Sequence, residues 1–447
     1  MITPEPIRPP AVNAWLLALA DDLQKRKRDH LWRQLPIVQS TQGPTIKIDG
    51  HEYLQFCTNN YLGLADHPEV IDSARQAVSH WGFGTGASRL IAGSMQSHHE
   101  LESELAGFKK TQAALVFTSG YAANMAVLGT FAGAGDWILS DKLNHASLLD
   151  AARFSQARCH TFGHLNYQRA QSLLERIKTR SASSTHDDHI EFNDDQVSDA
   201  LEESQDAATG NQRRRFLVTD TVFSMDGDLA DLPQLTRLGR AHDALVVIDE
   251  AHATGVLGPD GRGVAALQNV ESDIAVGIGT LSKALGSVGG FVFGDRTIID
   301  SLINKARHFI YTTALPAACS SAALTALRIA RREPQLRQRV MTLAQKVRSE
   351  LKAMGYSCGL SESPIIPVIL GGSHSALTAA ARLKEQGIYV PAIRPPTVPP
   401  NTARIRISLM ATHTDEHIGR LLHALKQMRG DPSIMHEPSF TGGGTNR

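Results

Sequence analysis

The order of apolar and polar positions divides most of the chain into alternating strands and helices. Apolar, β-branched runs that are typical of buried strands occur at Ala113–Phe117, at Arg215–Asp220 and from Ala244 to Asp249. Segments with apolar residues at helical spacing separate such runs, for example Leu232–Asp243. Because strands that alternate with helices pair in parallel, the pattern predicts an α/β fold with a mainly parallel sheet. Ligands of such sheets bind where the strands end.

The two ends of the chain have a different pattern. Near the start, we expect an amphipathic helix over Val12–His30 and a hairpin over Thr45–Glu52 that turns at Asp49-Gly50. After Arg331, a long helix is expected over Glu333–Met354. Strands and helices then follow in mixed order, at residues 364–370, 375–386, 388–393, 404–409 and 414–428. Both ends together therefore predict a small α+β domain.

These patterns define the expected domains. Residues 1–55 hold the N-terminal helix and hairpin of the small domain, residues 56–325 form a large domain, and residues 326–429 form the C-terminal α+β part. Residues 180–213 are rich in polar side chains and have no apolar face, so we expect a disordered surface insertion, with a partner-binding segment as the alternative. The tail 430–447 is also expected to be disordered.

Two stretches ahead of the Ala113 strand carry local signals. Gly82–Gly93 is too rich in glycine for a regular element and too long for a simple turn. Ser97-His-His-Glu100 has the spacing of a capping box and predicts the start of a helix that runs to Lys110. We expect the two adjacent histidines of this box to lie on the surface.

Composition narrows the class of partner and the compartment. The 45 Lys and Arg residues balance 45 Asp and Glu residues, so no net charge favours nucleic acid or a membrane surface as partner. The four cysteines are scattered, which indicates reduced packing residues in a cytoplasmic protein. The most apolar stretch, Ala113–Ala134, is interrupted by polar residues and glycines, so it predicts a buried core segment and no membrane span.

The stretch with the most distinctive chemistry is Gly277–Gly290, with Lys283 near its centre. A short buried strand is expected over Asp273–Ile278, followed by small hydroxylated residues, the lysine and glycines. A lysine amine attacks an aldehyde well when partial burial or a nearby cation lowers its pKa. The hydroxyls of Thr280 and Ser282 could hold a phosphate. The alternative interpretation is a glycine-rich loop with a solvated lysine.

Three further segments place polar groups at expected strand ends. Ser119-Gly120-Tyr121 lies between a strand and a helix start, where backbone N–H groups and the helix dipole favour an anion. His145 follows a short strand expected over Ile138–Ser140. Asp249-Glu-Ala-His252 spells a helicase motif, but the Gly-Lys of the phosphate loop that helicases require occurs nowhere in the sequence. A zinc site on Asp249, His252 and His145 lacks a supporting His or Cys cluster, so we expect no metal.

A pyridoxal phosphate site explains more of these residues at once. This cofactor requires a lysine for its aldehyde, a carboxylate at its ring nitrogen, a group over its ring and donors to its phosphate. Lys283, Asp249 and His145 fit the first three roles. The backbone of Gly120–Tyr121 and the hydroxyl of Thr280 fit the fourth. A buried carboxylate favours a protonated ring nitrogen through close Coulomb attraction.

Seven motifs make the chain similar to the α-oxoamine synthases, which are fold-type I pyridoxal phosphate enzymes that join an amino acid to an acyl-CoA with loss of carbon dioxide. The resemblance spans about Leu31–Met428 apart from the insertion. It implies a homodimer with the cofactor at the subunit interface, where Thr312 and Thr313 reach the neighbour's phosphate. The motifs are Asn59-Asn-Tyr-Leu-Gly63, Thr85-Gly-Ala-Ser-Arg-Leu90, Ser119-Gly-Tyr-Ala-Ala-Asn124, Asn144-His-Ala-Ser147, Phe223-Ser-Met-Asp-Gly227, Asp249-Glu-Ala-His252 and Thr280-Leu-Ser-Lys283.

The resemblance assigns cofactor roles to single residues. It makes Lys283 the residue that binds the cofactor aldehyde and later removes the α-proton of the substrate. His145 would lie over the ring and Asp249 would pair with its nitrogen. His252 and Ser224 would contact the region of the ring hydroxyl.

The resemblance also indicates the substrates. The run Ala392–Pro399 favours the family members that condense L-alanine with pimeloyl-CoA, or with the pimeloyl carrier-protein thioester, in biotin synthesis. Arg394 would hold the alanine carboxylate with Thr397 nearby, and Asn59 would also line the substrate site. Arg33 is the candidate for the far carboxylate of the pimeloyl chain.

Other interpretations remain open at this stage. The sister enzymes 2-amino-3-ketobutyrate CoA ligase, 5-aminolevulinate synthase and serine palmitoyltransferase share the lysine, aspartate and histidine set. A non-catalytic subunit with the same fold would be expected to lose the lysine, and Lys283 is present. The chain departs from the family at His164-Leu-Asn166, where His-Asn-Asp is usual.

Overall fold

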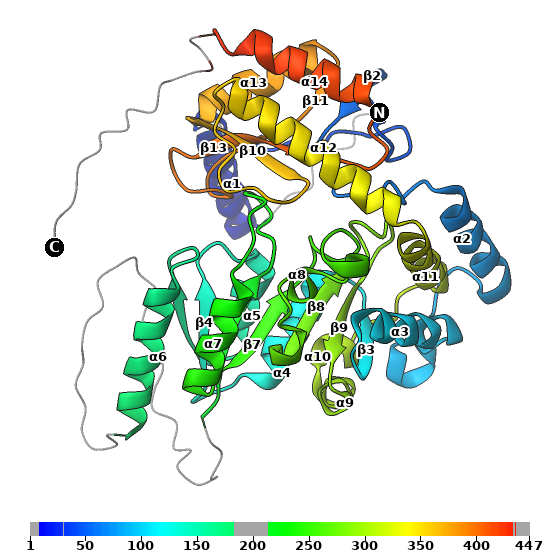
Figure 1. The fold of residues 1–447 in the computed structure, drawn as a ribbon, viewed down its shortest axis with the longest axis vertical. Coiled ribbons are helices and arrows are strands. Elements are labelled where there is room, and N and C mark those ends of the chain that lie inside the picture. Colours follow the sequence, from blue (N-terminus) through cyan, green and yellow to red (C-terminus); the bar gives the residue numbers. More distant parts are fainter. Residues whose placement is uncertain (1–8, 30, 183–212, 432–433, 435–447) are drawn as a thin grey trace. The chain divides into compact units, whose positions relative to one another are not determined.

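The computed structural model describes residues 9–29, 31–182, 213–431 and 434 (Figure 1). The segment 180–213 and the tail from residue 430 lie almost wholly outside the described residues. No helix in the described part of the chain is long and apolar enough to cross a membrane.

The chain divides into two compact units. Unit 1 contains the chain up to Pro68, the short segment Ser224–Asp228 and the chain from Arg332 onward. Unit 2 contains Glu69–Phe223 and Leu229–Arg331. The segment Ser224–Asp228 belongs to unit 1 although both of its neighbours in the chain belong to unit 2.

Unit 2 is built around a seven-stranded sheet of order β3-β9-β8-β7-β6-β4-β5 (Figure 1). In this sheet β9 runs antiparallel to both of its neighbours, β3 and β8, and the other paired strands are parallel. This arrangement confirms the predicted α/β fold with a mainly parallel sheet. The strands are β3 (Ala113–Phe117), β4 (Trp137–Asp141), β5 (Arg158–Phe162), β6 (Arg215–Asp220), β7 (Leu245–Asp249), β8 (Val276–Thr280) and β9 (Gly290–Gly294).

Helices between the strands bury the sheet. The apolar helix α4 (Gly120–Phe131) packs against β8 and β9 and also against α5 (Ala146–Phe154). Its residues Val127 and Leu128 belong to the same buried cluster as Ile278 of β8. The other helices of this part are α2 (Pro68–Trp81), α3 (Gln96–Lys109), α6 (Tyr167–Ala182), α7 (Leu232–His242), α8 (Val264–Leu267), α9 (Arg296–Lys305), α10 (Arg307–Ile310) and α11 (Ala317–Arg332).

Unit 1 contains two three-stranded sheets. One has the order β1-β2-β11 and the other the order β10-β13-β12. The predicted hairpin is present, and its turn at Asp49-Gly50 has positive φ angles of 50° and 82°. The elements are β1 (Thr45–Ile48), β2 (His51–Gln55), β10 (Ile365–Gly371), β11 (Ile388–Tyr389), β12 (Ala392–Ile393), β13 (Ala403–Ser408), α1 (Pro10–Arg28), α12 (Pro334–Ala353), α13 (Ser373–Glu385) and α14 (Asp415–Met428).

The prediction of a single strand over residues 388–393 is wrong. The segment forms β11 and β12, which belong to different sheets of unit 1. Pro391 lies between them. A proline has no N–H to donate to a strand ladder, so the chain changes sheets at this residue.

The prediction of a capping box at Ser97-His-His-Glu100 is also wrong. Helix α3 begins at Gln96, with Met95 as its N-cap residue. His98 occupies the third helical position, and its Nδ1 accepts a hydrogen bond from the backbone N–H of Met95 at 3.0 Å. Its Nε2 lies 2.6 Å from the carbonyl oxygen of Leu315. His98 is therefore fully buried, and only His99 is the surface residue that the sequence predicted.

The glycine-rich stretch ahead of α3 contains a short regular element. Residues Arg89–Gly93 form a π-helix in place of the irregular loop that was expected. Its last turn requires a glycine, because a Cβ at Gly93 would lie 2.2 Å from the carbonyl oxygen of Ala87.

Helix α1 is present as predicted, but its apolar positions are not buried. None of its residues falls in the buried class within the described part of the chain. Among its large apolar side chains, Trp15 and Leu17 are the most exposed, at 63% and 68%.

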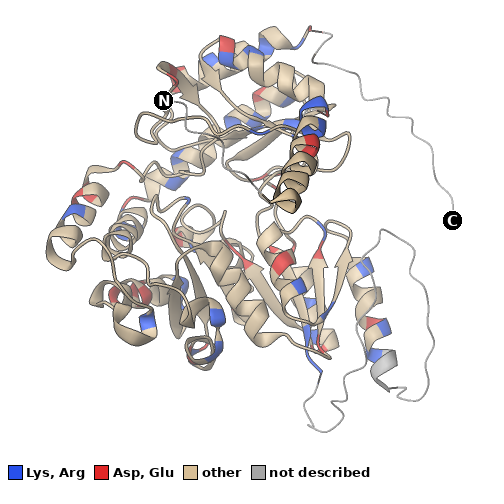
Figure 2. Ribbon diagram, turned by 180° about the vertical axis from the view of Figure 1, so that it is seen from behind, with Lys and Arg blue, Asp and Glu red and all other residues tan. Residues whose placement is uncertain are grey.

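Figure 2 shows positive and negative residues interspersed on the elements of each unit, in line with the balanced charge of the sequence.

Candidate active site

The carboxyl ends of the parallel strands of unit 2 place most of the predicted cofactor residues at one edge of the sheet. Strands β3, β4, β6, β7 and β8 all end at this edge (Figure 1). Asp220 and Asp249 are the last residues of β6 and β7, and the segments after the strands contain Gly120 and Tyr121, His145, His252 and Lys283. This is the edge at which open α/β sheets bind ligands.

Lys283 lies in a short connection between β8 and the antiparallel strand β9. Both sides of this connection are joined by hydrogen bonds, from Leu281 N–H to the Gly289 carbonyl and from Ser287 N–H to the Leu281 carbonyl, each at 2.9 Å. The hydroxyl of Thr280 donates to the same Gly289 carbonyl at 2.9 Å and lies 2.8 Å from the hydroxyl of Ser282. Glycine at 289 has a φ of +123°, which an L side chain would strain. The connection is therefore fixed at both ends.

The amine of Lys283 contacts one of the predicted histidines. Its Nζ lies 2.9 Å from Nε2 of His252. His252 belongs to the turn that follows β7, and β7 pairs with β8 in parallel register. Adjacent strands therefore bring the lysine and the histidine together, although they are 31 positions apart in the sequence.

Asp249 is held by a residue whose role the sequence did not predict. The side-chain amide of Asn124 donates to Asp249 Oδ2 at 2.7 Å and to the Ser147 hydroxyl at 2.8 Å. That hydroxyl lies 2.7 Å from Nδ1 of His145, so one chain of contacts joins Asp249 to His145. Burial lowers the pKa of His145, against the opposing effect of the Asp249 charge. An asparagine inside an otherwise apolar helix was the available signal for this role.

Asp220 is a second residue at this edge that sequence reasoning missed. It ends β6 directly opposite Asp249 in the parallel register. Its Oδ2 accepts the backbone N–H of His145 at 2.6 Å, which fixes the position of that histidine. Burial, followed by the nearby Asp249 charge, raises the pKa of Asp220 well above its ordinary value. The signal in the sequence was an acidic residue at the end of an apolar strand.

The start of α4 has the local structure that the sequence predicted for an anion site. Ser119 caps the helix, with its hydroxyl accepting the Ala122 N–H at 3.0 Å. A Cβ at Gly290 would lie 2.6 Å from the Gly120 backbone, so glycine is required for this close approach. The side chain of Thr280 lies beside Gly120, 3.6 Å from the point that a Cβ there would occupy. The Tyr121 hydroxyl donates to Asp150 at 2.6 Å, which leaves only the Tyr121 backbone for the predicted role.

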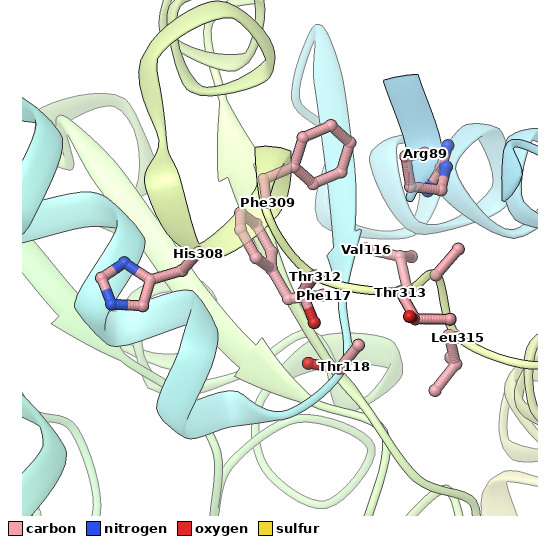
Figure 3. A pocket seen from close by; sticks show the side chains of 10 residues that line it. Arg89, Val116, Phe117, Thr118, His308, Phe309, Thr312, Thr313 and Leu315 are labelled. Atoms are coloured by element: carbon pink, nitrogen blue, oxygen red, sulfur yellow. The ribbon is translucent and has the colours of Figure 1, made fainter. Parts of the chain in front are cut away.

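A pocket of unit 2 is lined by the two threonines that were expected to contact a neighbouring subunit. Thr312 and Thr313 line it together with Thr118, which directly precedes the anion site (Figure 3). Arg89 also lines the pocket and makes two hydrogen bonds to the carboxylate of Glu102, at 2.8 and 3.0 Å. The pocket therefore presents threonine hydroxyl groups beside the Arg89 guanidinium, whose charge is already paired with Glu102.

The remaining predicted residues lie in unit 1 and form two groups. In the first group, Nη2 of Arg33 donates to the Thr397 hydroxyl at 3.3 Å, and Arg394 reaches the Trp32 carbonyl at 3.5 Å. Burial, followed by the Arg33 charge, lowers the pKa of Arg394. The buried Nε of Arg394 has no hydrogen-bond partner in the described part of the chain. We call Arg33, Arg394 and Thr397 the arginine cluster.

The second group of unit 1 is organised by Arg406, which sequence reasoning did not select. Its Nη2 donates to Asn59 Oδ1 at 3.1 Å, and its Nε donates to the backbone carbonyl of Ser224 at 2.5 Å. The Tyr61 hydroxyl lies 3.2 Å from the same Asn59 oxygen, and burial raises the pKa of Tyr61 to about 12. Buried Arg406 and partly buried Asn59 therefore form a polar pair to which Ser224 is joined through its backbone.

The residues at the sheet edge of unit 2 fit pyridoxal phosphate. A partly buried lysine, a buried carboxylate, a neutral histidine and a glycine-lined helix start supply the four kinds of group that the cofactor needs. The buried Oδ1 of Asn124 has no protein partner within the described residues, so the edge retains an unused acceptor. No group of His, Cys, Asp or Glu side chains in the described residues has the arrangement of a metal site.

The fold and this set of residues define the fold-type I class of pyridoxal phosphate enzymes. Residues 51–425 match the family of class I and II aminotransferases, and the chain belongs to this family. The chain is 40% identical over 417 residues to 8-amino-7-oxononanoate synthase of Hahella chejuensis, covering 93% of this chain and 97% of the relative. It is 42% identical over 410 residues to the synthase of the same name from Stutzerimonas stutzeri, covering 92% and 96%.

Solved structures give the same result for the fold. A serine palmitoyltransferase of S. paucimobilis with bound PLP superposes with a TM-score of 0.81 at 28% identity, over 93% of this chain and 97% of the other. An 8-amino-7-oxononanoate synthase of Francisella tularensis superposes with a TM-score of 0.67 at 26% identity, over 84% and 97%. The resemblance predicted from the seven motifs is confirmed, as is the cofactor.

Proposed function

We propose that the protein condenses L-alanine with a pimeloyl thioester and releases carbon dioxide, which gives 8-amino-7-oxononanoate for biotin synthesis. The thioester is that of CoA or of a carrier protein. The observation that carries this proposal is the contact of Lys283 with His252, beside Asp249 and at one sheet edge. It occurs in a chain that is 40–42% identical, along more than nine-tenths of its length, to synthases of this name.

The proposed role of the residues at the sheet edge of unit 2 is to stabilise a charge on the cofactor and to transfer a proton. Pyridoxal phosphate, when bound, supplies an aldehyde for the amine of the substrate and a ring that withdraws electrons from its α-carbon. Nζ of Lys283 takes the proton from the alanine α-carbon and returns a proton after carbon dioxide has left. Asp249, oriented by Asn124, holds the positive charge of the ring nitrogen. His145, whose pKa is lowered by burial, would present its face to the ring.

The proposed work of unit 1 is to bind the substrate carboxylates. Arg394 is our candidate for the alanine carboxylate, and Arg33 is our candidate for the far carboxylate of the pimeloyl chain. Both arginines belong to one cluster that has no acidic partner in the described residues, so an incoming anion would satisfy them. The pair of Arg406 and Asn59 is a second candidate for the alanine carboxylate, because it already combines a buried guanidinium with a predicted substrate residue.

A sister activity is the second candidate function. The serine palmitoyltransferases among the solved structures have TM-scores of 0.81–0.82 at 28–29% identity, which are both higher than the values of 0.67 and 26% for the 8-amino-7-oxononanoate synthase structure. Backbone similarity therefore does not separate the two activities. The sequence relatives favour the synthase.

We also propose that the active form is a homodimer. Phe83, Ile91 and Tyr311 are large side chains that are 71–82% exposed. Their segments lie together, because the Thr85 hydroxyl donates to the Ala314 carbonyl and the Ala314 N–H donates to the Ala87 carbonyl. An apolar patch of this kind is typical of a protein–protein interface.

The test is thiol release from pimeloyl-CoA by the purified protein with bound pyridoxal phosphate. L-alanine, glycine and L-serine are offered separately, and the amino ketone product is identified by mass. We expect release with L-alanine only. Release with glycine or L-serine in preference would assign a sister activity, and no release with any of the three despite bound cofactor would contradict the proposal.

A further inference from the structure

A buried ion pair lies behind the turn that carries the cofactor residues of β7. Lys109, at the end of α3, and Glu250, directly after Asp249, lie 2.6 Å apart with side chains only 2% and 1% exposed. Neither residue has a part in the proposed reaction. Burying two charges costs free energy that a good geometry has to offset, so such a pair needs an explanation.

The lysine uses all of its donors in this place. Besides Glu250, Nζ donates to the Thr254 hydroxyl at 3.0 Å and to the Arg262 carbonyl at 2.5 Å. An ammonium group has three N–H donors, so Lys109 has no capacity left for another partner. It also lies 4.7 Å from the centre of the Phe293 ring, which favours a cation.

The glutamate is fixed as completely as the lysine. Its Oε1 accepts the Ala265 N–H at 3.0 Å, and its own N–H donates to the Ile278 carbonyl of β8 at 2.8 Å. A Cβ at Gly263 would lie 1.9 Å from Oε2, so only glycine leaves room for the carboxylate. Glu250 is therefore enclosed on every side that these contacts describe.

These contacts close a loop around His252. Lys109 binds the side chains of residues 250 and 254, and the Ala253 and Thr254 N–H groups donate to the Glu250 carbonyl. His252 lies within this closed turn, with its ring 2.9 Å from Lys283. The orientation of His252 therefore depends on an anchor that comes from a different element, α3.

We propose that Lys109 is a positioning residue, which through Glu250 and Thr254 holds the turn after β7 so that Asp249 and His252 face the cofactor and Lys283. This inference rests on the proposed function for its catalytic meaning, but not for the anchoring itself. Lys109 touches none of the reacting groups and acts only through the turn.

The test compares three variants with one matched control. Lys109→Met removes the ammonium but keeps the length of the side chain, Lys109→Arg keeps the charge, and Thr254→Val removes a single acceptor without leaving a charge unpaired. The control is Asp136→Asn, which weakens the ion pair between buried Asp136 and exposed Arg214 at the opposite, amino edge of the same sheet.

The first readout is amide hydrogen exchange in the cofactor-free protein, which is independent of catalysis. We expect exchange over residues 249–257 to rise at least about tenfold in Lys109→Met, to rise less in Thr254→Val and to return toward the wild-type rate in Lys109→Arg. Asp136→Asn should raise exchange near its own strand only. Unchanged exchange over 249–257 in both Lys109→Met and Thr254→Val would overturn the proposal.

The second readout is the visible circular dichroism of the bound cofactor, which reports the orientation of the groups around it. We expect Lys109→Met and Thr254→Val to change this signal, and Asp136→Asn to leave it as in the wild type. If Asp136→Asn changed it equally, Lys109 would be an ordinary stabilising residue. If the proposed activity were absent while the exchange result held, the proposed function would fail and the anchoring would stand.

Discussion

The candidate residues of the two units differ in how their polar groups are satisfied. At the sheet edge of unit 2, Lys283, Asp249 and His145 each contact another side chain of the protein. In the arginine cluster of unit 1, Arg33 and Arg394 lie together, and no carboxylate among the described residues is within ion-pair distance of either. The protein itself preorganises the first group, and we propose that a substrate anion completes the second.

This difference indicates a division of work. A preorganised set suits groups that act on every turnover with the same cofactor, because no reorganisation is needed when the reaction takes place. An unsatisfied pair of cations suits recognition, because a substrate without the matching carboxylate would leave the charges unpaired. The following variants test this division, from the largest expected effect to the smallest.

Lys283→Ala should have the largest effect. It removes the group that we propose moves the α-proton, and general-base catalysis alone contributes about 10²- to 10⁴-fold. We expect kcat in the thiol-release assay to fall by at least this factor. Lys305→Ala, on the surface of the same unit, is the control and should keep the wild-type kcat. A decrease in kcat of less than about tenfold in Lys283→Ala would contradict the proposed division of roles between the two units.

Variants of the arginines should change substrate recognition by a smaller factor. A hydrogen bond to a charged group contributes about 1.5–3 kcal/mol, so one lost arginine corresponds to roughly 10- to 100-fold in KM. We expect Arg394→Leu to raise the KM for L-alanine and Arg33→Leu to raise the KM for the pimeloyl thioester. The measurement is initial rate against each substrate in turn.

Arg406→Leu completes this comparison. If it raises the KM for L-alanine while Arg394→Leu raises only that for the thioester, the alanine carboxylate belongs to Arg406 and Asn59. The arginine cluster would then serve the pimeloyl chain alone.

Unit 1, which holds the arginines, should lose stability in acid. Burial lowers the pKa of His413 in unit 1 to about 4 from its ordinary 6.5. Nδ1 of His413 accepts the Met410 N–H and Nε2 contacts the Gln55 carbonyl, which is the bonding of a neutral ring. Because the unfolded chain binds this proton more readily, the contribution of His413 is complete above pH 6.5 and is lost as the pH falls toward 4.

The size and the test of this pH effect follow from the shift. A difference of about 2.5 pKa units corresponds to about 3 kcal/mol between pH 7 and pH 4. We would measure the free energy of unfolding by urea at several pH values in this window. It should fall less steeply with decreasing pH in His413→Gln than in the wild type. His51→Gln, at an exposed histidine of the same unit, should keep the wild-type slope, and an equal slope in His413→Gln would contradict the assignment.

The smallest effect is expected at Leu165 in unit 2, where the chain departs from its family. Leu165 has a φ of +55°, a region that a leucine occupies at a cost of about 1–2 kcal/mol. Its N–H donates to Asp141 at 2.9 Å, and the variant keeps this bond. Leu165→Asn should therefore raise the free energy of unfolding by about 1 kcal/mol, since asparagine tolerates this conformation. Leu165→Ala keeps the strain and should give no such gain.

The sequence was sufficient for the sheet of unit 2 because that sheet follows simple patterns. The strands Ala113–Phe117 and Arg215–Asp220 have the predicted bounds, since a fully buried strand is a continuous apolar run. The strand before Lys283 was placed too early, because Glu271–Asp273 form a short helical turn and β8 continues through Gly279 and Thr280. The glycines of β8 make this strand hard to recognise in the sequence. They are required because the rings of Phe291 and Phe293 occupy the space beside them.

The residues that hold the site were harder to predict than the residues that form it. Lys283 and Asp249 belong to recognisable motifs, whereas Asn124 and Asp220 act through contacts between elements far apart in the sequence. His98 was misplaced for the same reason, because its burial comes from the Leu315 carbonyl, 217 positions away. Local patterns contain no information about such distant partners. The roles proposed for these residues remain predictions.

The antiparallel strand β9 has a mechanical consequence for Lys283. A parallel successor to β8 would need a long crossover, whereas β9 returns at once and keeps the lysine in a loop hydrogen-bonded at both ends. The backbone at Lys283 then acts as a fixed pivot, and the amine travels only by rotation about its own side-chain bonds. Such rotations take picoseconds to nanoseconds. Repeated proton delivery by this arm would therefore need no movement of the scaffold.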